Sequence, residues 1–284
     1  MNYFLHILTM TAIYLPSVLG YNLVLGRGKI LHFGSTGVTL VTAYAIFLTQ
    51  RAFGSYVPAL FVGLFVVLLI SAFFAWLALC LDGDALGILT IAVHLSLLAI
   101  VFNWSSLTRG ALGITQIPRM SGLSTLPAFA LVSTVIAVLF FIFMLRIDRS
   151  FIGRSLSALA ENQAHAQSLG VSRSRTYLLT FLLAGSGAFF SNILYPQYIG
   201  ILHPNDFGFP DLIFYVMCVT AGGPGSVFGV TLSTILLIVL KEGLRFIPLP
   251  YGLIGPIRLM LFGMILISAV WYRRKELFPV QRTV

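Results

Sequence analysis

Two uninterrupted apolar stretches, residues 57–81 and 126–145, limit most strictly what this chain can fold into. Neither contains an Asp, Glu, Lys or Arg residue. A helix of about 20 apolar residues crosses the ~30 Å hydrocarbon core of a bilayer, and both stretches are long enough to do so. Only 9% of the 284 residues are charged, whereas about 25% are charged in a typical soluble domain. We therefore predict an all-α polytopic membrane protein in which residues 1–284 form a single transmembrane domain.

The basic residues fall mainly into two clusters: Arg146, Arg149, Arg154, Arg173 and Arg175, and then Arg273, Arg274, Lys275 and Arg282. Cytoplasmic loops of membrane proteins carry an excess of Lys and Arg, so both clusters are predicted to be cytoplasmic. Residues 273–284 would then form a cytoplasmic C-terminal tail. This distribution differs from the basic face of a nucleic-acid-binding protein. We therefore attribute the net charge of +9 to membrane topology and expect no nucleic-acid partner.

The number of crossings follows from these two clusters, because an even number of crossings must separate two cytoplasmic segments. The predicted crossings are residues 3–25, 33–49, 57–81, 86–103, 126–145, 177–195, 212–221, 227–240 and 259–272. This predicts a bundle of about 8–10 transmembrane helices. The start of the chain lacks a basic n-region, which indicates a retained first helix and not a cleaved signal peptide.

Two of these crossings, residues 212–221 and 227–240, are short, and the sequence GGPGSVFG (residues 222–229) lies between them. Irregular backbone at membrane depth is tolerated only where protein or a water-filled cavity covers its polar groups. We therefore predict a turn or a broken helix buried at membrane depth. A single long, kinked helix is the alternative, but it would place the sequence RRK (residues 273–275) outside the cell.

Several function classes lack the residues that they need. All eight acidic residues fall in loops or at the ends of predicted crossings, whereas an ion-driven carrier usually binds its coupling ion near the midplane. His94 lies in the middle of a crossing, and we interpret it as a packed, hydrogen-bonded side chain. The five histidines have no acidic partner at catalytic spacing, and the sequence GxxxxGK(S/T) is absent. We therefore expect no catalytic, cofactor or metal site and no disulfide, and we expect a partner to supply energy.

One polar segment interrupts the apolar sequence. SALAENQAHAQSLGVSRSR (residues 157–175) has the composition of a water-soluble helix, and Gly170 suits the left-handed conformation that ends a helix. Its apolar stripe comprises Leu156, Leu159 and Ala160, and its hydrogen-bonding groups belong to Glu161, Asn162 and Gln163. Such a helix is suited to docking into a cytoplasmic partner. The alternative is a solvated loop helix without a partner.

The same segment resembles the coupling region of permeases in bacterial ABC importers, in particular the branched-chain amino acid permease family of the second-type importer fold. The residues that match the family's A-x-x-E-N core and the positions after it are Ala158, Glu161, Asn162, Ala164 and Gly170. Three further segments are similar to the family, in the same order: TRGALGITQIP (residues 108–118), HPNDFGF (203–209) and GGPGSVFG (222–229).

The resemblance implies a permease in which residues 153–171 form a cytoplasmic coupling helix that docks into separate ATPase subunits. It also implies a second, non-identical permease subunit, an extracytoplasmic solute-binding protein and a location in the bacterial inner membrane. The implied solute is a branched-chain amino acid, with urea, a short amide or a sugar as alternatives. An ion-coupled secondary transporter is the alternative from a different class.

The predicted translocation path comprises Asn22, Gly34, Ser35, Gly222 and Gly223. Helix ends and free backbone groups at breaks near Gly34 and Gly222 can accommodate a zwitterion without a fixed counter-charge. Residues 20–37 are similar to the first hairpin of the family. Within them Arg27 and Lys29 depart from the family's usual aromatic and small residues, and Ser35 stands where the family often has histidine. These two basic residues either line the path or lie in the cytoplasm.

Overall fold

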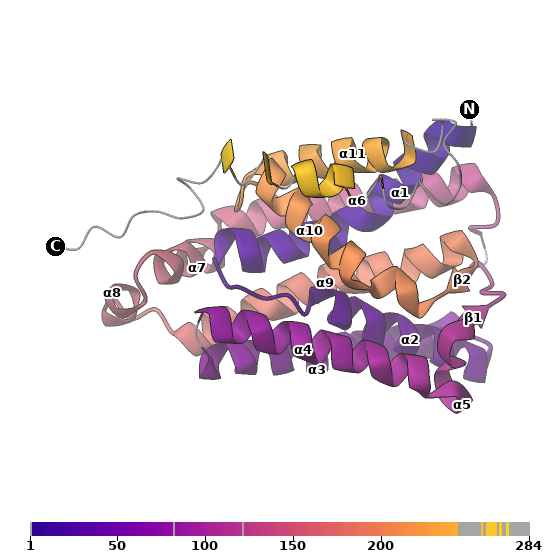
Figure 1. Ribbon diagram of the computed structural model, residues 1–284, viewed down its shortest axis with the longest axis horizontal. Coiled ribbons are helices and arrows are strands. Elements are labelled where there is room, and N and C mark those ends of the chain that lie inside the picture. The colour runs from indigo at the N-terminus through magenta and orange to yellow at the C-terminus, as the bar shows by residue number, and fades with distance from the viewer. Residues whose placement is uncertain are drawn as a thin grey trace.

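The computed structural model describes residues 2–81, 83–120, 122–243, 257, 260–265, 267–268 and 271–272. This part of the chain is helical almost throughout, and its longest helices run side by side (Figure 1). In chain order the main helices are α1 (Asn2–Tyr21), α2 (Ser35–Phe53), α3 (Tyr56–Cys80), α4 (Gly83–Asn103), α6 (Leu126–Arg149), α9 (Arg173–Ile199), α10 (Phe209–Gly222) and α11 (Val227–Gly243). The predicted all-α fold is confirmed.

Five helices in the described part are long and apolar enough to cross a membrane: Tyr3–Arg27, Tyr56–Cys80, Gly83–Asn103, Leu126–Arg149 and Arg173–Ile199. Each coincides with a predicted crossing, as do α2 and the two shorter helices, α10 with 14 residues and α11 with 17. On α3, Phe61 is 71% exposed and Phe65 66% exposed, which suits a lipid-facing surface. The chain is therefore a multi-pass helical membrane protein. The predicted crossing 259–272 lies partly, and the tail 273–284 wholly, outside the described residues.

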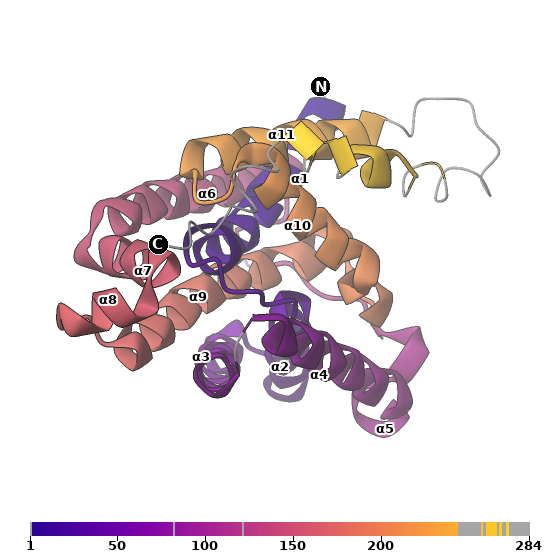
Figure 2. The same ribbon diagram turned by 60° about the vertical axis from the view of Figure 1, so that its left-hand side comes forward.

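Helix α1 lies at the centre of the bundle, enclosed by α6, α9, α10 and α11 (Figure 2). Small residues let the backbones of α1 and α9 touch. A Cβ atom added to Gly20 would lie 2.5 Å from the Ala184 carbonyl oxygen, and one added to Gly187 would lie 2.2 Å from that of Pro16. The amide of Ser17 is bonded to α9 as well, because it donates to Ser191 Oγ at 3.1 Å. Helices α2, α3 and α4 form a second layer beside α9 (Figure 2).

The connection between α1 and α2 is not a surface loop. Helix α1 continues into the π-helical turn η1 (Asn22–Arg27), and residues 29–34 then run without regular secondary structure back into the bundle (Figure 1). The amide of Phe33 in this segment donates to Thr90 Oγ1 on α4 at 3.0 Å. Helix α2 therefore begins inside the protein, at Ser35. The sequence predicted a break here, but not that Ile30 and His32 within it are buried.

The two ends of the bundle differ in structure (Figure 1). One end, here called the ladder end, carries α5 (Ser105–Thr108), η2 (Gly110–Leu112), η3 (Pro204–Phe207) and the strands β1 (Ile114–Thr115) and β2 (Ile201–Leu202). These strands pair antiparallel, with Ile114 opposite Leu202. The other end, here called the basic end, carries α7 (Phe151–Glu161), α8 (Gln163–Ser168) and the central cluster of arginines. Helix α1 begins at the ladder end and runs toward the basic end.

Candidate functional site

The segment that the sequence predicts as one coupling helix is formed by two helices. Helices α7 and α8 meet at Asn162, which has an extended backbone (φ −153°, ψ 103°). Its Oδ1 atom accepts a hydrogen bond from the His165 amide at 3.0 Å, so Asn162 caps α8. The prediction of one continuous helix over residues 153–171 is therefore wrong, because this local bond competes with helix continuation. Gly170 has a φ of +88°, as predicted for a glycine that ends a helix.

The apolar side of α7 faces the protein's own core. Leu156 is 0% exposed and Leu159 is 4% exposed, and both belong to a cluster that includes Val24 and Val67. The prediction that this stripe is offered to a partner is therefore wrong. The predicted coupling residues that are exposed are Glu161, Asn162, Ala164 and Gly170, while Ala158 is half-buried. The sequence interpretation missed Leu169, which lies between Ala164 and Gly170 in the chain and is 73% exposed.

The end of η1 connects this segment to the central helix. A Cβ atom on Gly28 would lie 3.1 Å from Leu156 Cδ1, so α7 packs directly beneath η1. The Arg27 Nε atom lies 3.3 Å from Asp148 Oδ1, and both side chains are partly exposed. Asp148 is in the last turn of α6, immediately before α7. Of the two basic residues left open by the sequence, Arg27 is thus an ion-pair partner at the basic end, and Lys29 is exposed there.

The predicted turn after α10 also rests on η1. Asn22 Oδ1 accepts a hydrogen bond from the Gly225 amide at 2.9 Å, although the two residues are 203 positions apart. Helices α10 and α11 touch through glycines, because a Cβ atom on Gly229 would lie 1.9 Å from the Gly222 carbonyl oxygen. The predicted turn between the two helices is confirmed, but its predicted burial at membrane depth is not. The turn lies beside Arg27, at the basic end of the bundle and not in its middle (Figure 1).

A small cavity with a volume of about 30 Å³, here called the central cavity, lies where α1, η1, α2, α3, α9 and α10 converge. Ser35 lines it, and Gly34 precedes it with no room for a side chain, because a Cβ atom there would lie 2.6 Å from the Phe74 ring. Asn22 lines a different small cavity beside Asp148. Gly222 and Gly223 line neither of these two cavities. The structure thus places only part of the predicted path together.

His32 is a cavity residue that the sequence interpretation missed. It is 3% exposed, and its ring lies between Phe74 and Phe181, with centroids 4.6 and 5.1 Å away. The surrounding sequence GRGKILHFG resembles a loop, so only its apolar Ile30, Leu31 and Phe33 could have indicated burial. His94, by contrast, is confirmed as a packed residue whose ring nitrogens lie 3.4 Å from Thr36 Oγ1.

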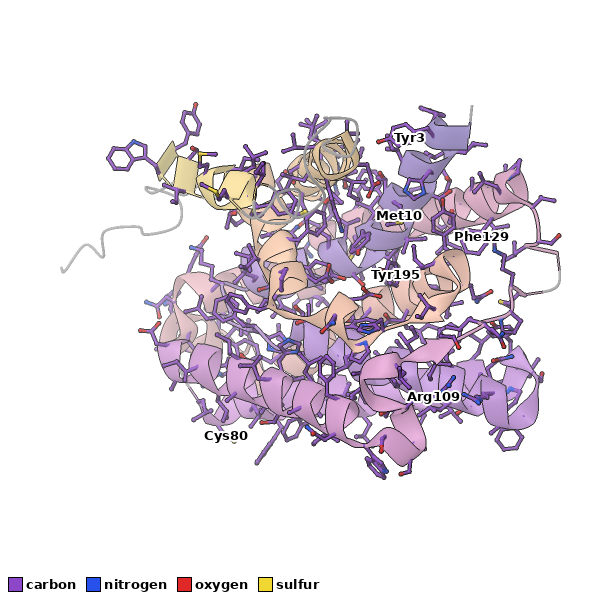
Figure 3. All side chains as sticks on the ribbon, turned by 45° about the vertical axis from the view of Figure 1, so that its right-hand side comes forward. Tyr3, Met10, Cys80, Arg109, Phe129 and Tyr195 are labelled. Atoms are coloured by element: carbon purple, nitrogen blue, oxygen red, sulfur yellow. The ribbon has the colours of Figure 1, made fainter. Side chains whose placement is uncertain are left out.

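A second, outer cavity lies nearer the ladder end and is lined by Tyr195, Asp206 and Asp211. Tyr215 lines both this cavity and the central one. Tyr195 points into the interior of the bundle, whereas Cys80 and Arg109 lie at its periphery (Figure 3). Burial raises the pKa of the Asp206 carboxyl above its ordinary value.

The ends of other helices add charge near this outer cavity. The Lys241 ammonium lies 5.1 Å from the centre of the Tyr14 ring, and Glu242 pairs with His6 at 3.3 Å. Asp206, Asp211 and Glu242 lie at helix ends, as predicted, but the sequence did not show that Asp206 and Asp211 line one cavity. Among the described residues, no three His, Cys, Asp or Glu side chains converge as a metal site would require.

Two of the motifs singled out in the sequence meet at the ladder end. TRGALGITQIP contributes β1 and HPNDFGF directly follows β2, and the two strands pair. His203 Nε2 lies 2.8 Å from the Ala111 carbonyl oxygen, and Tyr56 on α3 donates a hydrogen bond to the Pro118 carbonyl. These contacts form an ordered surface at the ladder end of the bundle.

Comparison with known proteins gives consistent matches. The family profile described as "Branched-chain amino acid transport system / permease component" matches residues 3–270. The chain is 30% identical to the "High-affinity branched-chain amino acid transport system permease protein LivM" of Salmonella typhimurium, over 97% of this chain and 70% of that protein. The protein of the same description from Escherichia coli is 29% identical over the same shares.

A more distant relative is the "Probable branched-chain amino acid transport permease protein LivM" of Methanocaldococcus jannaschii. It is 25% identical over 90% of this chain and 80% of that protein. No solved structure gives a significant match.

Proposed function

This chain belongs to the branched-chain amino acid transport system permease family, and on that premise we propose that it is the permease subunit through which an ABC importer moves a branched-chain amino acid across the inner membrane. The single observation that carries the proposal is the α7–α8 segment. It projects from the basic end with Glu161, Asn162 and Ala164 exposed, while Leu156 anchors it in the core.

The α7–α8 segment has the properties needed to receive force from an ATPase. Within the described residues the ion pairs involve other side chains, so Glu161 is available to a partner. Leu169 adds an exposed apolar group for docking. A rigid body that is buried on one side and exposed on the other transmits a push to the helices on which it rests. We therefore assign the basic end to the cytoplasm, and the excess of basic residues in the C-terminal tail assigns that tail to the same side of the membrane.

The contacts of η1 couple a movement of the α7–α8 segment to the helices of the bundle. Leu156 packs against Gly28, Asp148 pairs with Arg27, and Asn22 holds the turn between α10 and α11 through Gly225. Movement of α7 would then shift α1 and the α10–α11 pair together. Both α1 and α10 contribute to the central cavity, so ATP binding at the cytoplasmic face would open and close that cavity.

The remaining partners follow from the same proposal. A second, non-identical permease subunit would complete the membrane part, and an extracytoplasmic solute-binding protein would dock on the ladder end. The ordered surface of the ladder end comprises β1, β2 and η3. Solute selection would rest mainly on that binding protein. Urea, short amides and sugars stay as alternative solutes, and ion-coupled transport by this chain alone is the alternative mechanism.

A substitution on the exposed side of α7 tests the coupling role. Glu161→Trp is expected to leave the amount of protein in the membrane unchanged but to abolish co-purification of the ATPase and transport-linked ATP hydrolysis. Ser106→Trp, at an exposed position of α5 on the opposite end, is the matched control for ATPase binding and is expected to retain co-purification. Normal co-purification and hydrolysis in Glu161→Trp would remove the coupling assignment.

A further inference from the structure

The central cavity contains polar atoms that have no partner within the protein. The hydroxyl of Tyr21, Nδ1 of His32 and the hydroxyl of Ser35 are buried without a hydrogen bond, and all three residues line the cavity. Leaving buried polar groups unpaired is unfavourable. Tyr21 is 2% exposed and His32 is 3% exposed. Since the Phe74 and Phe181 rings hold the His32 ring between them, the ring is fixed in place at the cavity.

The same cavity adjoins an uncapped helix N-terminus. Helix α2 has 19 residues, and its N-cap Gly34 provides no side-chain hydrogen bond. Its first turn is nevertheless inside the protein: Thr36 and Gly37 are buried, and Ser35 and Val38 line the cavity. The amides at a helix N-terminus and the helix dipole together attract a carboxylate. The structure thus has an unused anion site beside three unpaired polar atoms.

The rest of the cavity wall is uncharged, and it combines apolar surface with further hydroxyl-bearing side chains, among them Ser17 and Ser71. Val24, Val38 and Ala188 contribute aliphatic surface, and no Asp, Glu, Lys or Arg side chain lines the cavity. A phosphate or a metal ion would need opposite charge in the wall, which this cavity lacks. A solute with a carboxylate, an ammonium and a compact aliphatic side chain matches this lining. The carboxylate suits the N-terminus of α2, the ammonium suits the unpaired hydroxyl oxygens, and the aliphatic side chain suits the apolar wall.

We propose that the central cavity is a transient binding site for an aliphatic α-amino acid. The carboxylate accepts hydrogen bonds from the amides at the start of α2, the hydroxyl oxygens of Tyr21 and Ser35 accept from the ammonium, and the side chain packs on Val24, Val38 and Ala188. This inference rests on the proposed function and deepens it. The cavity is narrow in this conformation, so the solute enters when α1 and α10 move.

The test uses the complete importer in proteoliposomes: this chain, its partner permease, the ATPase subunits and the solute-binding protein, with labelled leucine and valine. The first variant is Tyr21→Phe combined with Ser35→Ala. It is expected to lower the maximum uptake per ATP hydrolysed about a hundred-fold, since two hydrogen bonds to a charged group are lost and each contributes roughly ten-fold. The concentration of loaded binding protein that gives half-maximal uptake should not change, because that value reflects docking.

The second variant narrows the cavity. Ala188→Val is expected to lower the ratio of leucine to valine uptake about ten-fold, since a pocket discriminates by one methylene group to roughly this extent. A general folding defect would not change this ratio. Two controls match the variants: Tyr44→Phe removes another buried, unpaired hydroxyl, and Ala59→Val enlarges another fully buried alanine. Neither residue lines the central cavity.

The outcomes separate the two proposals. ATP-dependent leucine uptake by the wild type, with losses confined to the cavity variants, supports both. The same wild-type uptake with cavity variants that behave like Tyr44→Phe and Ala59→Val overturns the cavity site alone. A wild-type complex that hydrolyses ATP without taking up either amino acid refutes the proposed function and the cavity site together.

Discussion

Replacing Gly229 with alanine is expected to separate α10 from α11 at the turn that rests on η1. The added Cβ atom would lie 1.9 Å from the Gly222 carbonyl oxygen. That separation is more than an ångström shorter than an ordinary contact between a carbon and an oxygen, about 3.3 Å even for a weak C–H···O contact. The backbone fixes the position of the Cβ atom, and the oxygen belongs to the backbone, so no side-chain rotation can relieve the overlap. The helices themselves must move.

The size of the effect follows from that overlap. Overpacking in a well-packed core costs about 1–3 kcal/mol, which lowers the Tm by about 2–4 °C for each kcal/mol in a protein of roughly this size. The displaced turn would also weaken the hydrogen bond between Asn22 and Gly225. We therefore expect Gly229→Ala to reduce both the thermal stability of the complex and its leucine uptake.

Thermal unfolding of the purified complex, followed by the fluorescence of a thiol- or tryptophan-based probe, measures this effect. Gly243→Ala is the matched control, because a Cβ atom there would meet nothing within 4 Å, and its Tm should equal that of the wild type. The turn is a packing element and not a phosphate loop, so nucleotide affinity should be unchanged in both variants. A Gly229→Ala complex with normal stability, or with intact assembly but lost nucleotide binding, would refute this explanation.

Three further results are expected. Arg27→Asp should lower uptake per ATP hydrolysed while costing no more than about 1 kcal/mol of stability, as for a partly exposed ion pair. Adding Asp148→Arg should restore part of the lost uptake. An unchanged loss in the double variant would show that the pair does not couple α6 to η1. Asn162→Ala should weaken ATPase co-purification, because losing a helix cap costs about 0.5–2 kcal/mol, whereas Asn162→Asp should retain it; equal binding by both would exclude the cap. Because burial raises the pKa of Asp206, the folded state binds its proton more tightly than the unfolded state, so ionisation destabilises the fold. The Tm of the wild type should fall relative to Asp206→Asn as pH rises above about 4, the ordinary pKa of an Asp carboxyl, and parallel curves would contradict this.

The sequence predicted the long helices well, for a physical reason. A membrane requires apolar runs of nearly fixed length, so residues 57–81 and 126–145 identified α3 and α6 almost to their ends. The turn between α10 and α11 was predictable too, because GGPGSVFG combines several glycines with a proline between two apolar runs. These features depend on local composition alone.

The features that were missed depend on contacts between distant residues. The pattern of α7 revealed an apolar stripe with Leu156, but not that η1 would cover it. The break at Asn162 results from one side-chain hydrogen bond, which can form only when the helix stops. His32 lies in a sequence that would suit a surface loop, and only the packing of Phe74 and Phe181 around it makes it a core residue.

Uptake of labelled leucine, urea and ribose by cells that carry the complete transporter, compared with cells that lack only this chain, tests most directly whether the chain is a branched-chain amino acid permease. We expect ATP-dependent leucine uptake to disappear without this chain, while the ATPase subunits and the solute-binding protein are still produced at normal levels. Leucine uptake that persists without the chain, or a dependence confined to ribose or urea, would contradict the amino acid assignment.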